Sequence, residues 1–145
     1  MNIDIYIKEL VAINGGHLEI KDNYFRAADG YCIDKSGREI SFSAPEEIDA
    51  SLRRVITVFS DEFESANDLA SLSRTFARFY YGFIAVHPFT DGNYRTACTF
   101  LQRRAQEKSY EIASLRILKK ILLEGAVAAE MQKLMTAFEI ILKPQ

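Results

Sequence analysis

The sequence predicts a mainly helical protein with one β-hairpin, built as a single domain over residues 1–145. Two patterns favour this class. Apolar residues recur at spacings of three and four along most of the chain, as they do on one face of a helix. One stretch, about residues 22–43, instead carries aromatic and β-branched residues between turn signals, which is typical of a hairpin. The composition, 48% hydrophobic and 26% charged, is that of a folded globular protein.

The elements of the first half of the chain follow from local signals. A helix is expected over residues 3–12, and the Asn-Gly-Gly sequence at 14–16 ends it. Within the hairpin, the turn sequence DKSG at 34–37 is the expected tip. Pro45 then opens a helix that we expect to end near Phe59, with apolar residues at Ile48, Leu52, Val55 and Val58.

The second half reads as a series of helices. Asn67 or Asp68 can cap the first, which runs to His87 and has an apolar face formed by Leu69, Leu72, Phe76, Phe79 and Phe83. The next starts just after Gly92 and is expected to bury Ala97, Phe100, Leu101 and Ala105. Ser114 is the expected cap of a helix over 115–128, and a last helix is expected over about 131–142.

Charge and composition exclude several function classes. The net charge of -2 and the pI of about 5.7 give no electrostatic case for binding nucleic acid or an anionic membrane. No stretch is long and apolar enough to span a bilayer, and the opening MNIDIYIKEL lacks the apolar segment of a signal peptide. We therefore expect a cytoplasmic protein, or an effector delivered by a route that the sequence does not show. Cys32 and Cys98 match no metal-binding spacing.

The sequence HPFTDGNYR, residues 87–95, places polar residues in a loop between two predicted helices. Amides at the start of a helix carry partial positive charge, which favours phosphate binding there. Gly92 allows the backbone to turn with positive φ and to approach a ligand closely. Asn93 offers an amide, and the Arg95 guanidinium can form paired hydrogen bonds with phosphate oxygens.

Two further residues of this loop predict catalysis. Asp91 is an oxygen ligand of the kind that Mg²⁺ prefers, above all when phosphates share the ion. His87 is the nearby base whose ordinary pKa lies close to neutrality. A phosphate site with a metal ligand and a base indicates phosphoryl or nucleotidyl transfer.

These residues resemble the signature of the Fic proteins, HPFx(D/E)GN(G/K)R, and more loosely the related Doc toxins. HPFTDGNYR matches it at each specified position except Tyr94. The stretch from YFR to SAPEEI is similar to the family's hairpin flap, and SLRILKKILLEGAVAA with the last helix is similar to its C-terminal pair. The resemblance covers roughly residues 20–142 and implies a Fic-type helical bundle with a β-hairpin flap.

The resemblance also implies a reaction and its participants. Such proteins typically transfer AMP from ATP to a Ser, Thr or Tyr side chain of a target protein, which docks on the flap by strand addition. An antitoxin-like inhibitor is a second kind of partner in the family. The implied roles are proton abstraction by His87, a loop anchor for Phe89, Mg²⁺ binding by Asp91, and phosphate contacts by Gly92, Asn93 and Arg95.

Two positions depart from the family pattern and leave the function open. Tyr94 stands where the family has glycine or lysine, so its ring is expected to border the nucleotide, narrow the pocket or change the donor. Cys98 stands where many members have a second arginine. Three hypotheses remain: a protein adenylyltransferase, a Doc-like or altered-donor phosphotransferase, and a catalytically degenerate Fic fold that serves as a protein-binding module.

Overall fold

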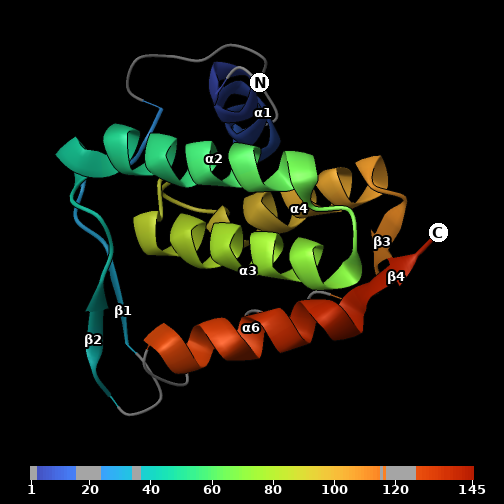
Figure 1. Cartoon of the computed structure of the whole chain (residues 1–145). Helices are drawn as coiled ribbons and strands as arrows, with labels where there is room; N and C mark the ends of the chain where they lie inside the picture. Colours follow the sequence, from blue (N-terminus) through green and yellow to red (C-terminus); the bar gives the residue numbers. More distant parts are fainter. Residues whose placement is uncertain (1–2, 16–23, 34–36, 115, 117–126) are drawn as a thin grey trace.

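The computed structural model of the chain describes residues 3–15, 24–33, 37–114, 116 and 127–145. The long helices α2 (Ile48–Ser65) and α3 (Leu69–Val86) lie side by side, with α6 (Val127–Ile141) packed along the far side of α3 (Figure 1). Helix α1 (Ile3–Gly15) packs on α4 (Asn93–Glu107) and on α2. A mainly helical fold with a β-hairpin is therefore confirmed.

The predicted hairpin is present, formed by β1 (Tyr31–Ile33) and β2 (Glu39–Ser41), but it is shorter than the expected 22–43, because the described residues 24–30 form no strand. The strands are antiparallel, and Cys32 pairs with Ile40 at the centre of the register. Most of the expected tip, residues 34–36, lies outside the described residues. The hairpin stands at the end of the bundle where α2 begins and α3 ends (Figure 1), which places it beside the loop that follows α3.

Helix α2 differs in two ways from the sequence prediction. It follows a 3₁₀ turn, η1 (Pro45–Glu47), and continues to Ser65 rather than ending near Phe59. Its buried residues are Ile48, Leu52, Ile56, Phe59 and Phe63. Val58, which we expected on the apolar face, is 42% exposed. Val58 and Phe59 lie three and four positions after Val55, and either spacing fits one face of a helix. Phe59 is the one that is buried, at 2% exposed.

Helix α3 begins at a strong local signal. Of the two candidate caps, Asp68 is the one used: its side chain accepts a hydrogen bond from the Ser71 N–H at 2.7 Å, and the Ser71 hydroxyl completes a capping box. The expected apolar face is buried from Leu72 to Phe83, whereas Leu69 is 37% exposed at the helix start. The helix ends at Val86, one residue before His87.

The last part of the chain contains a second small sheet that the sequence did not predict. Strand β3 (Tyr110–Ile112) follows α4 and pairs with β4 (Leu142–Pro144), which directly follows α6. The expected helix over 115–128 falls mostly on residues that lie outside those described. The last helix begins at Val127 and ends at Ile141, close to its expected bounds. The β3–β4 pair ties the C-terminal end of α6 to the C-terminal end of α4.

The core between the helices is rich in aromatic side chains, and Phe59 lies at its centre. Its ring contacts Tyr6, Phe63, Phe76, Phe79 and Phe100, with centroid separations between 5.1 and 6.4 Å. These rings come from α1, α2, α3 and α4, so one side chain links four helices. Among the described helices, none combines the length and apolar character needed to cross a lipid bilayer.

Replacing Phe59 with alanine should strongly destabilise the fold. The side chain is 2% exposed, and truncating a buried phenylalanine costs about 3–5 kcal/mol in the free energy of unfolding. Urea denaturation followed by circular dichroism measures this loss. Val58→Ala is the matched control on the same helix, because its side chain is 42% exposed and the expected change is within about 0.5 kcal/mol. Equal losses in the two variants would contradict the central place of Phe59.

Candidate functional site

His87 directly follows helix α3 as its C-cap and lies in the left-handed region of the backbone, with φ 52° and ψ 61°. Its N–H still donates to the carbonyl of Phe83 at 2.9 Å, which is the last hydrogen bond of the helix type. After this residue the chain changes direction. The imidazole stacks on the ring of Phe42, which follows β2; the centroids are 3.8 Å apart and the planes differ by 5°. The hairpin thus holds the ring of the candidate base.

Burial is the main cause that lowers the pKa of His87 from its ordinary 6.5, and the positive charge of Arg26 adds to it. The backbone of Ile84 acts in the opposite direction. Nδ1 is buried and makes no hydrogen bond of acceptable geometry within the described part of the chain. At pH 7 the imidazole is therefore neutral, which is the form that can accept a proton.

Phe89 anchors the loop in the core. Its side chain is 1% exposed and packs against the rings of Tyr24, Phe25 and Phe83. The side-chain amide of Asn93 receives a hydrogen bond from the Phe89 N–H at 3.0 Å and donates one to the Phe89 carbonyl at 2.8 Å. Both polar groups of this buried amide are therefore used to close the loop.

Gly92 is the residue before α4 and is the second left-handed position of the loop, with φ 75°. The positive φ favours glycine here, and a Cβ would in addition lie 3.0 Å from Nη2 of Arg95 and 3.1 Å from Nδ2 of Asn14, so both side chains would have to shift slightly. Gly92 has no side chain that could cap this helix. The N–H groups of the first turn have no acceptors within the helix, as the predicted anion site requires.

Asp91 lies exposed directly before this helix start. One carboxylate oxygen, Oδ1, accepts a hydrogen bond from the Gly92 N–H at 2.8 Å. Among the described residues, no group of three or more His, Cys, Asp or Glu side chains gathers as a metal site. One carboxylate suits a Mg²⁺ ion that is held mainly by substrate phosphates and water.

Asn14, near the end of α1, contacts the loop although no sequence pattern predicted it there. Its Nδ2 donates to the Asp91 carbonyl at 2.7 Å and to the Thr96 hydroxyl at 3.2 Å, and its Oδ1 accepts from Tyr24 at 3.0 Å. Its own carbonyl accepts from the exposed Arg95 guanidinium at 3.1 Å. The sequence showed Asn14 only as part of a helix stop.

Tyr94 lies partly buried in the first turn of α4, and its ring meets Tyr80 of α3 edge to face at 6.4 Å. Its hydroxyl lies beside the thiol of Cys98, one turn further along the helix, and the two groups influence each other's pKa. Burial raises the pKa of Tyr94 to about 12 and that of Cys98 to about 11, so both groups keep their protons at neutral pH. The two departures from the family pattern are thus in direct contact.

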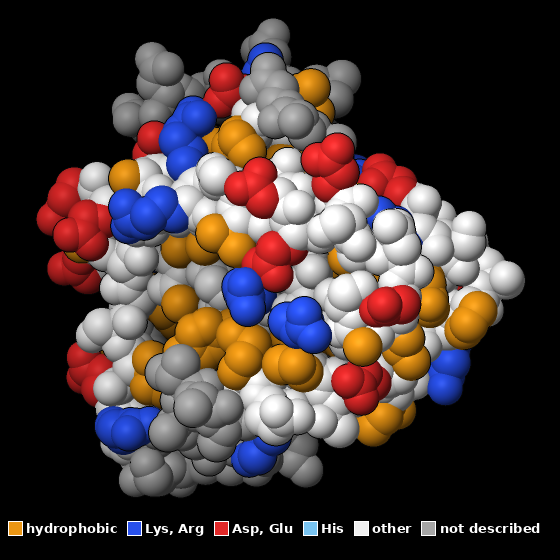
Figure 2. All heavy atoms as spheres, in the orientation of Figure 1, with side chains coloured by type: hydrophobic (Ala, Val, Ile, Leu, Met, Phe, Trp, Pro, Cys, Tyr) orange, Lys and Arg blue, Asp and Glu red, His pale blue; other side chains and the backbone are white. Residues whose placement is uncertain are grey.

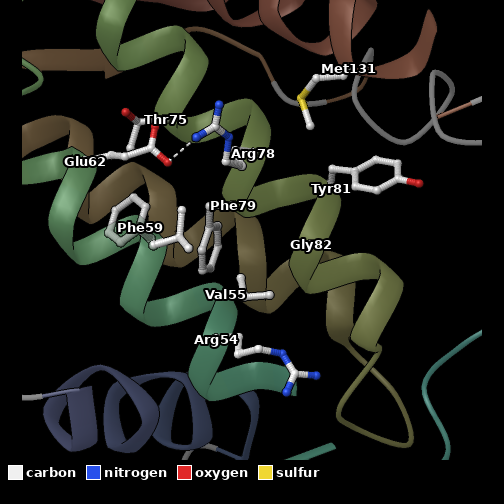
Figure 3. Close-up of a pocket in the computed structure, with 11 residues that line it drawn as sticks. Arg54, Val55, Phe59, Glu62, Thr75, Arg78, Phe79, Tyr81, Gly82 and Met131 are labelled. Carbon is white, nitrogen blue, oxygen red and sulfur yellow. Dashed lines mark hydrogen bonds and ion pairs between the residues drawn. The ribbon is translucent and has the colours of Figure 1, made fainter. Parts of the chain in front are cut away.

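A separate pocket of about 260 Å³ lies between α2 and α3 and reaches Met131 of α6 (Figure 3). Its walls include Val55, Phe59 and Phe79, and its carboxylate, Glu62, is paired with Arg78 at 2.7 Å. The space-filling view shows hydrophobic side chains in this region between the two helices, with basic side chains beside them (Figure 2). No residue of the loop 87–95 lines this pocket, so it is distinct from the candidate site.

The structure brings the predicted residues together in one loop between α3 and α4. His87 lies at the start of the loop, Asp91 lies before the second helix, and Gly92 to Arg95 form the helix start. Sequence reasoning missed Asn14, Phe42 and Arg26, which hold this loop from α1 and from the hairpin.

Comparisons with known proteins agree with this architecture. No curated protein matches the sequence. Among solved structures, the N-terminal Fic domain of a Bep effector protein from Bartonella quintana matches with a TM-score of 0.73 and 17% identity, over 95% of this chain and 71% of that one. The same kind of domain from Bartonella quintana with bound ADP matches with a TM-score of 0.64 and 16% identity, over 80% of this chain and 62% of that one.

A third structure, the BepC protein from Bartonella tribocorum with bound AMPPNP, has a TM-score of 0.63 and 15% identity, over 80% of this chain. This chain spans 63% of the length of BepC and 62% of the ADP-bound domain. These similarities show a shared fold. The model of the Fic/DOC family matches residues 5–103, which is more than half of the sequence, and the protein therefore belongs to the Fic/DOC family.

Proposed function

We propose that the protein transfers AMP from ATP to a hydroxyl side chain of a target protein. The observation that carries this proposal is the loop between α3 and α4, which begins with a neutral histidine and ends at an uncapped helix start. The loop is anchored in the core, and it holds His87, the proposed base, a few residues from the start of α4, the proposed anion site. These two features suit nucleotidyl transfer, in which positioning of the reactants and stabilisation of phosphate charge supply most of the catalysis.

In this reaction the target hydroxyl attacks the α-phosphorus of ATP. A new oxygen–phosphorus bond forms, the bond to the oxygen that bridges the α- and β-phosphates breaks, and pyrophosphate leaves. His87 accepts the proton of the hydroxyl, for which its lowered pKa is suited because the ring is neutral at pH 7. The stacking of this ring on Phe42 limits its rotation and so favours one orientation toward the target.

The first turn of α4 would hold the phosphates. The backbone N–H groups of Asn93 and its neighbours point outward there, and Arg95 lies exposed next to them. The Asn93 side chain supports this site indirectly, because its amide holds Phe89 in place. Asp91 would share a Mg²⁺ ion with the phosphates, and the ion would offset their negative charge.

Two observations support nucleotide and protein as the substrates. Two structural neighbours with the same fold hold the nucleotides AMPPNP and ADP. The β1–β2 hairpin lies beside His87, and no other described strand pairs with it, so we infer that an extended segment of a target adds to one of its outer edges.

An altered donor is the second candidate function, and the contact between Tyr94 and Cys98 favours it. A tyrosine ring held by Tyr80 and Cys98 replaces a small or flexible residue in the first turn of α4. Such a ring changes the room left for the terminal phosphates or for another group. ATP labelled on the α-phosphate and ATP labelled on the γ-phosphate, tested separately, distinguish AMP transfer from phosphorylation; no label from either would indicate a binding module.

His87→Ala should reduce label transfer from α-labelled ATP by about 10²- to 10⁴-fold, because the general base is lost. Folding and ATP affinity should remain, since the side chain lies at the edge of the phosphate site. His17→Ala, the chain's other histidine, is the control and should keep wild-type transfer. The wild-type rate should fall with decreasing pH only below pH 6.5, because the pKa of His87 is lowered. Full activity of His87→Ala would remove this residue from the mechanism.

Asp91→Ala should abolish the enhancement of ATP binding by Mg²⁺. The carboxylate lies exposed before the helix start, so its loss should leave the fold intact. Calorimetric titration with ATP, with Mg²⁺ and with a chelator, measures the enhancement in each variant. Asp91→Asn is the matched control, which keeps the hydrogen bond to Gly92 through its amide oxygen but removes the charge. If the enhancement is the same in all three proteins, the assignment of the metal to Asp91 is wrong.

Tyr94→Gly should bind ATP more tightly and transfer label faster than the wild type, because the ring no longer restricts the phosphate site. The helix-propensity cost is about 1 kcal/mol or less. Tyr94→Phe keeps the ring and removes the hydroxyl that lies beside Cys98, so it should behave as the wild type does if the ring is what restricts the site. Unchanged affinity and rate in Tyr94→Gly would show that the ring lies outside the donor site.

A further inference from the structure

Arg26, the residue that precedes the hairpin by a few positions, is buried although it carries a charge. It is 7% exposed, and its guanidinium donates only to backbone carbonyls in the described part of the chain. Nε donates to the carbonyl of His87 at 2.6 Å, and Nη2 donates to that of Val86 at 3.0 Å. The Arg26 N–H also donates to the Pro88 carbonyl at 2.9 Å. Three successive carbonyls of the α3 end are thus held by one residue.

The same guanidinium reaches both ends of the hairpin. Nη1 donates to the carbonyl of Ala28, before β1, at 2.8 Å, and Nη2 donates to the carbonyl of Ser43, after β2. The Ser43 N–H in turn donates to the carbonyl of Ala85 at 3.3 Å. Arg26 therefore joins the base of the hairpin to the end of α3, where the catalytic loop begins.

This burial is costly, and the backbone around it offsets the cost. A buried guanidinium without a paired carboxylate loses its hydration, and burial accordingly lowers the pKa of Arg26, with Asp29 acting in the opposite direction. The carbonyls at the end of α3 carry the partial negative charge of the helix terminus, which favours a cation at this position. The hydrogen bonds to these carbonyls therefore fix the position of the Arg26 guanidinium relative to the loop.

The held carbonyls matter because His87 has a left-handed backbone. That conformation is sterically unfavourable for a residue other than glycine, and relaxation to negative φ would turn the imidazole away from its present direction. The hydrogen bond to the His87 carbonyl and the one to the Pro88 carbonyl fix the peptide units on either side of this turn. Phe42, on the hairpin side, holds the ring itself.

We propose that Arg26 is a positioning residue: it locks the left-handed turn at His87 and thereby keeps the imidazole aligned with the hairpin that receives the target. The inference rests on the proposed function, because it treats His87 as the base. Arg26 touches neither donor nor target in this scheme. It acts through the backbone of His87, and its loss should lower the rate of transfer rather than the affinity for ATP.

The test compares Arg26→Lys and Arg26→Gln with Arg104→Lys. Lysine keeps the charge but has no planar guanidinium, so it cannot donate to all four carbonyls. Glutamine lacks both the guanidinium and the charge. Arg104 is a matched control, because it is equally buried, at 6% exposed, and is paired with Glu9 at 3.1 Å and Glu107 at 3.2 Å, both outside the loop. Any general effect of replacing a buried arginine should appear in all three variants.

Two measurements separate positioning from stability. In the Arg26 variants, kcat for label transfer should fall about 10- to 100-fold while the Kd for ATP stays within about twofold, because misplaced catalytic groups cost rate rather than binding. By NMR, the ring resonances of His87 should shift in both Arg26 variants. Its pKa should rise toward 6.5 in Arg26→Gln, since the nearby positive charge is removed. Arg104→Lys should change none of these. Unshifted His87 resonances in a folded Arg26 variant would overturn the proposal.

The NMR measurement needs no enzymatic activity, so the proposal and the proposed function can fail separately. If His87→Ala retains transfer, the reaction scheme is wrong, yet the effect of Arg26 on the His87 ring is still measured. If neither Arg26 variant folds, the wild-type protein decides: the Arg26 Nε–H should be strongly protected from exchange with water and should respond to the titration of His87. Exchange as fast as in a free arginine would overturn the proposal.

Discussion

The site depends on a backbone constraint: the chain turns left-handed at His87 and again at Gly92. The first turn ends α3 and directs the imidazole out of the helix, and the second starts α4 with its N–H groups uncapped. Between them, the Phe89 side chain is buried in the core, and the Asn93 side chain forms hydrogen bonds with the N–H and the carbonyl of Phe89. The loop is therefore a fixed connection between His87 at one end and the start of α4 at the other, the two places where the proposed function needs a base and an anion site.

Much of the fold is visible in the sequence because helices are specified locally. The stripe from Leu72 to Phe83 and the capping box at Asp68 identify α3 without any knowledge of its neighbours. Where prediction fails, the cause is an interaction between distant residues. Val58 fits the spacing of a helix face, but the place of Phe59 in the aromatic core decides which side is buried. Strands β3 and β4 are three residues each and about thirty residues apart, so neither carries a signal of its own.

The candidate site shows the same division. The residues from His87 to Arg95 are contiguous, and their types and order indicate an anion site with a base. The residues that hold this loop in place are not contiguous with it: Asn14 contacts it from α1, and Arg26 from the segment before the hairpin. Their partners in the loop are 61 to 81 positions away in the chain, a separation over which no local pattern extends. The contact of Tyr94 with Cys98 could have been suspected from their spacing of one helical turn, but the edge-to-face packing on Tyr80 could not.

The way in which Arg26 is bound has an evolutionary consequence. Its acceptors are main-chain carbonyls of Ala28, Ser43, Val86 and His87, and every amino acid supplies such a carbonyl. Side chains at positions 28, 43 and 86 can therefore diverge without removing a single acceptor. A coupling of this kind leaves no correlated substitutions between positions, so methods that infer contacts from covariation would not register it. In distant relatives, it would have to be recognised from backbone geometry.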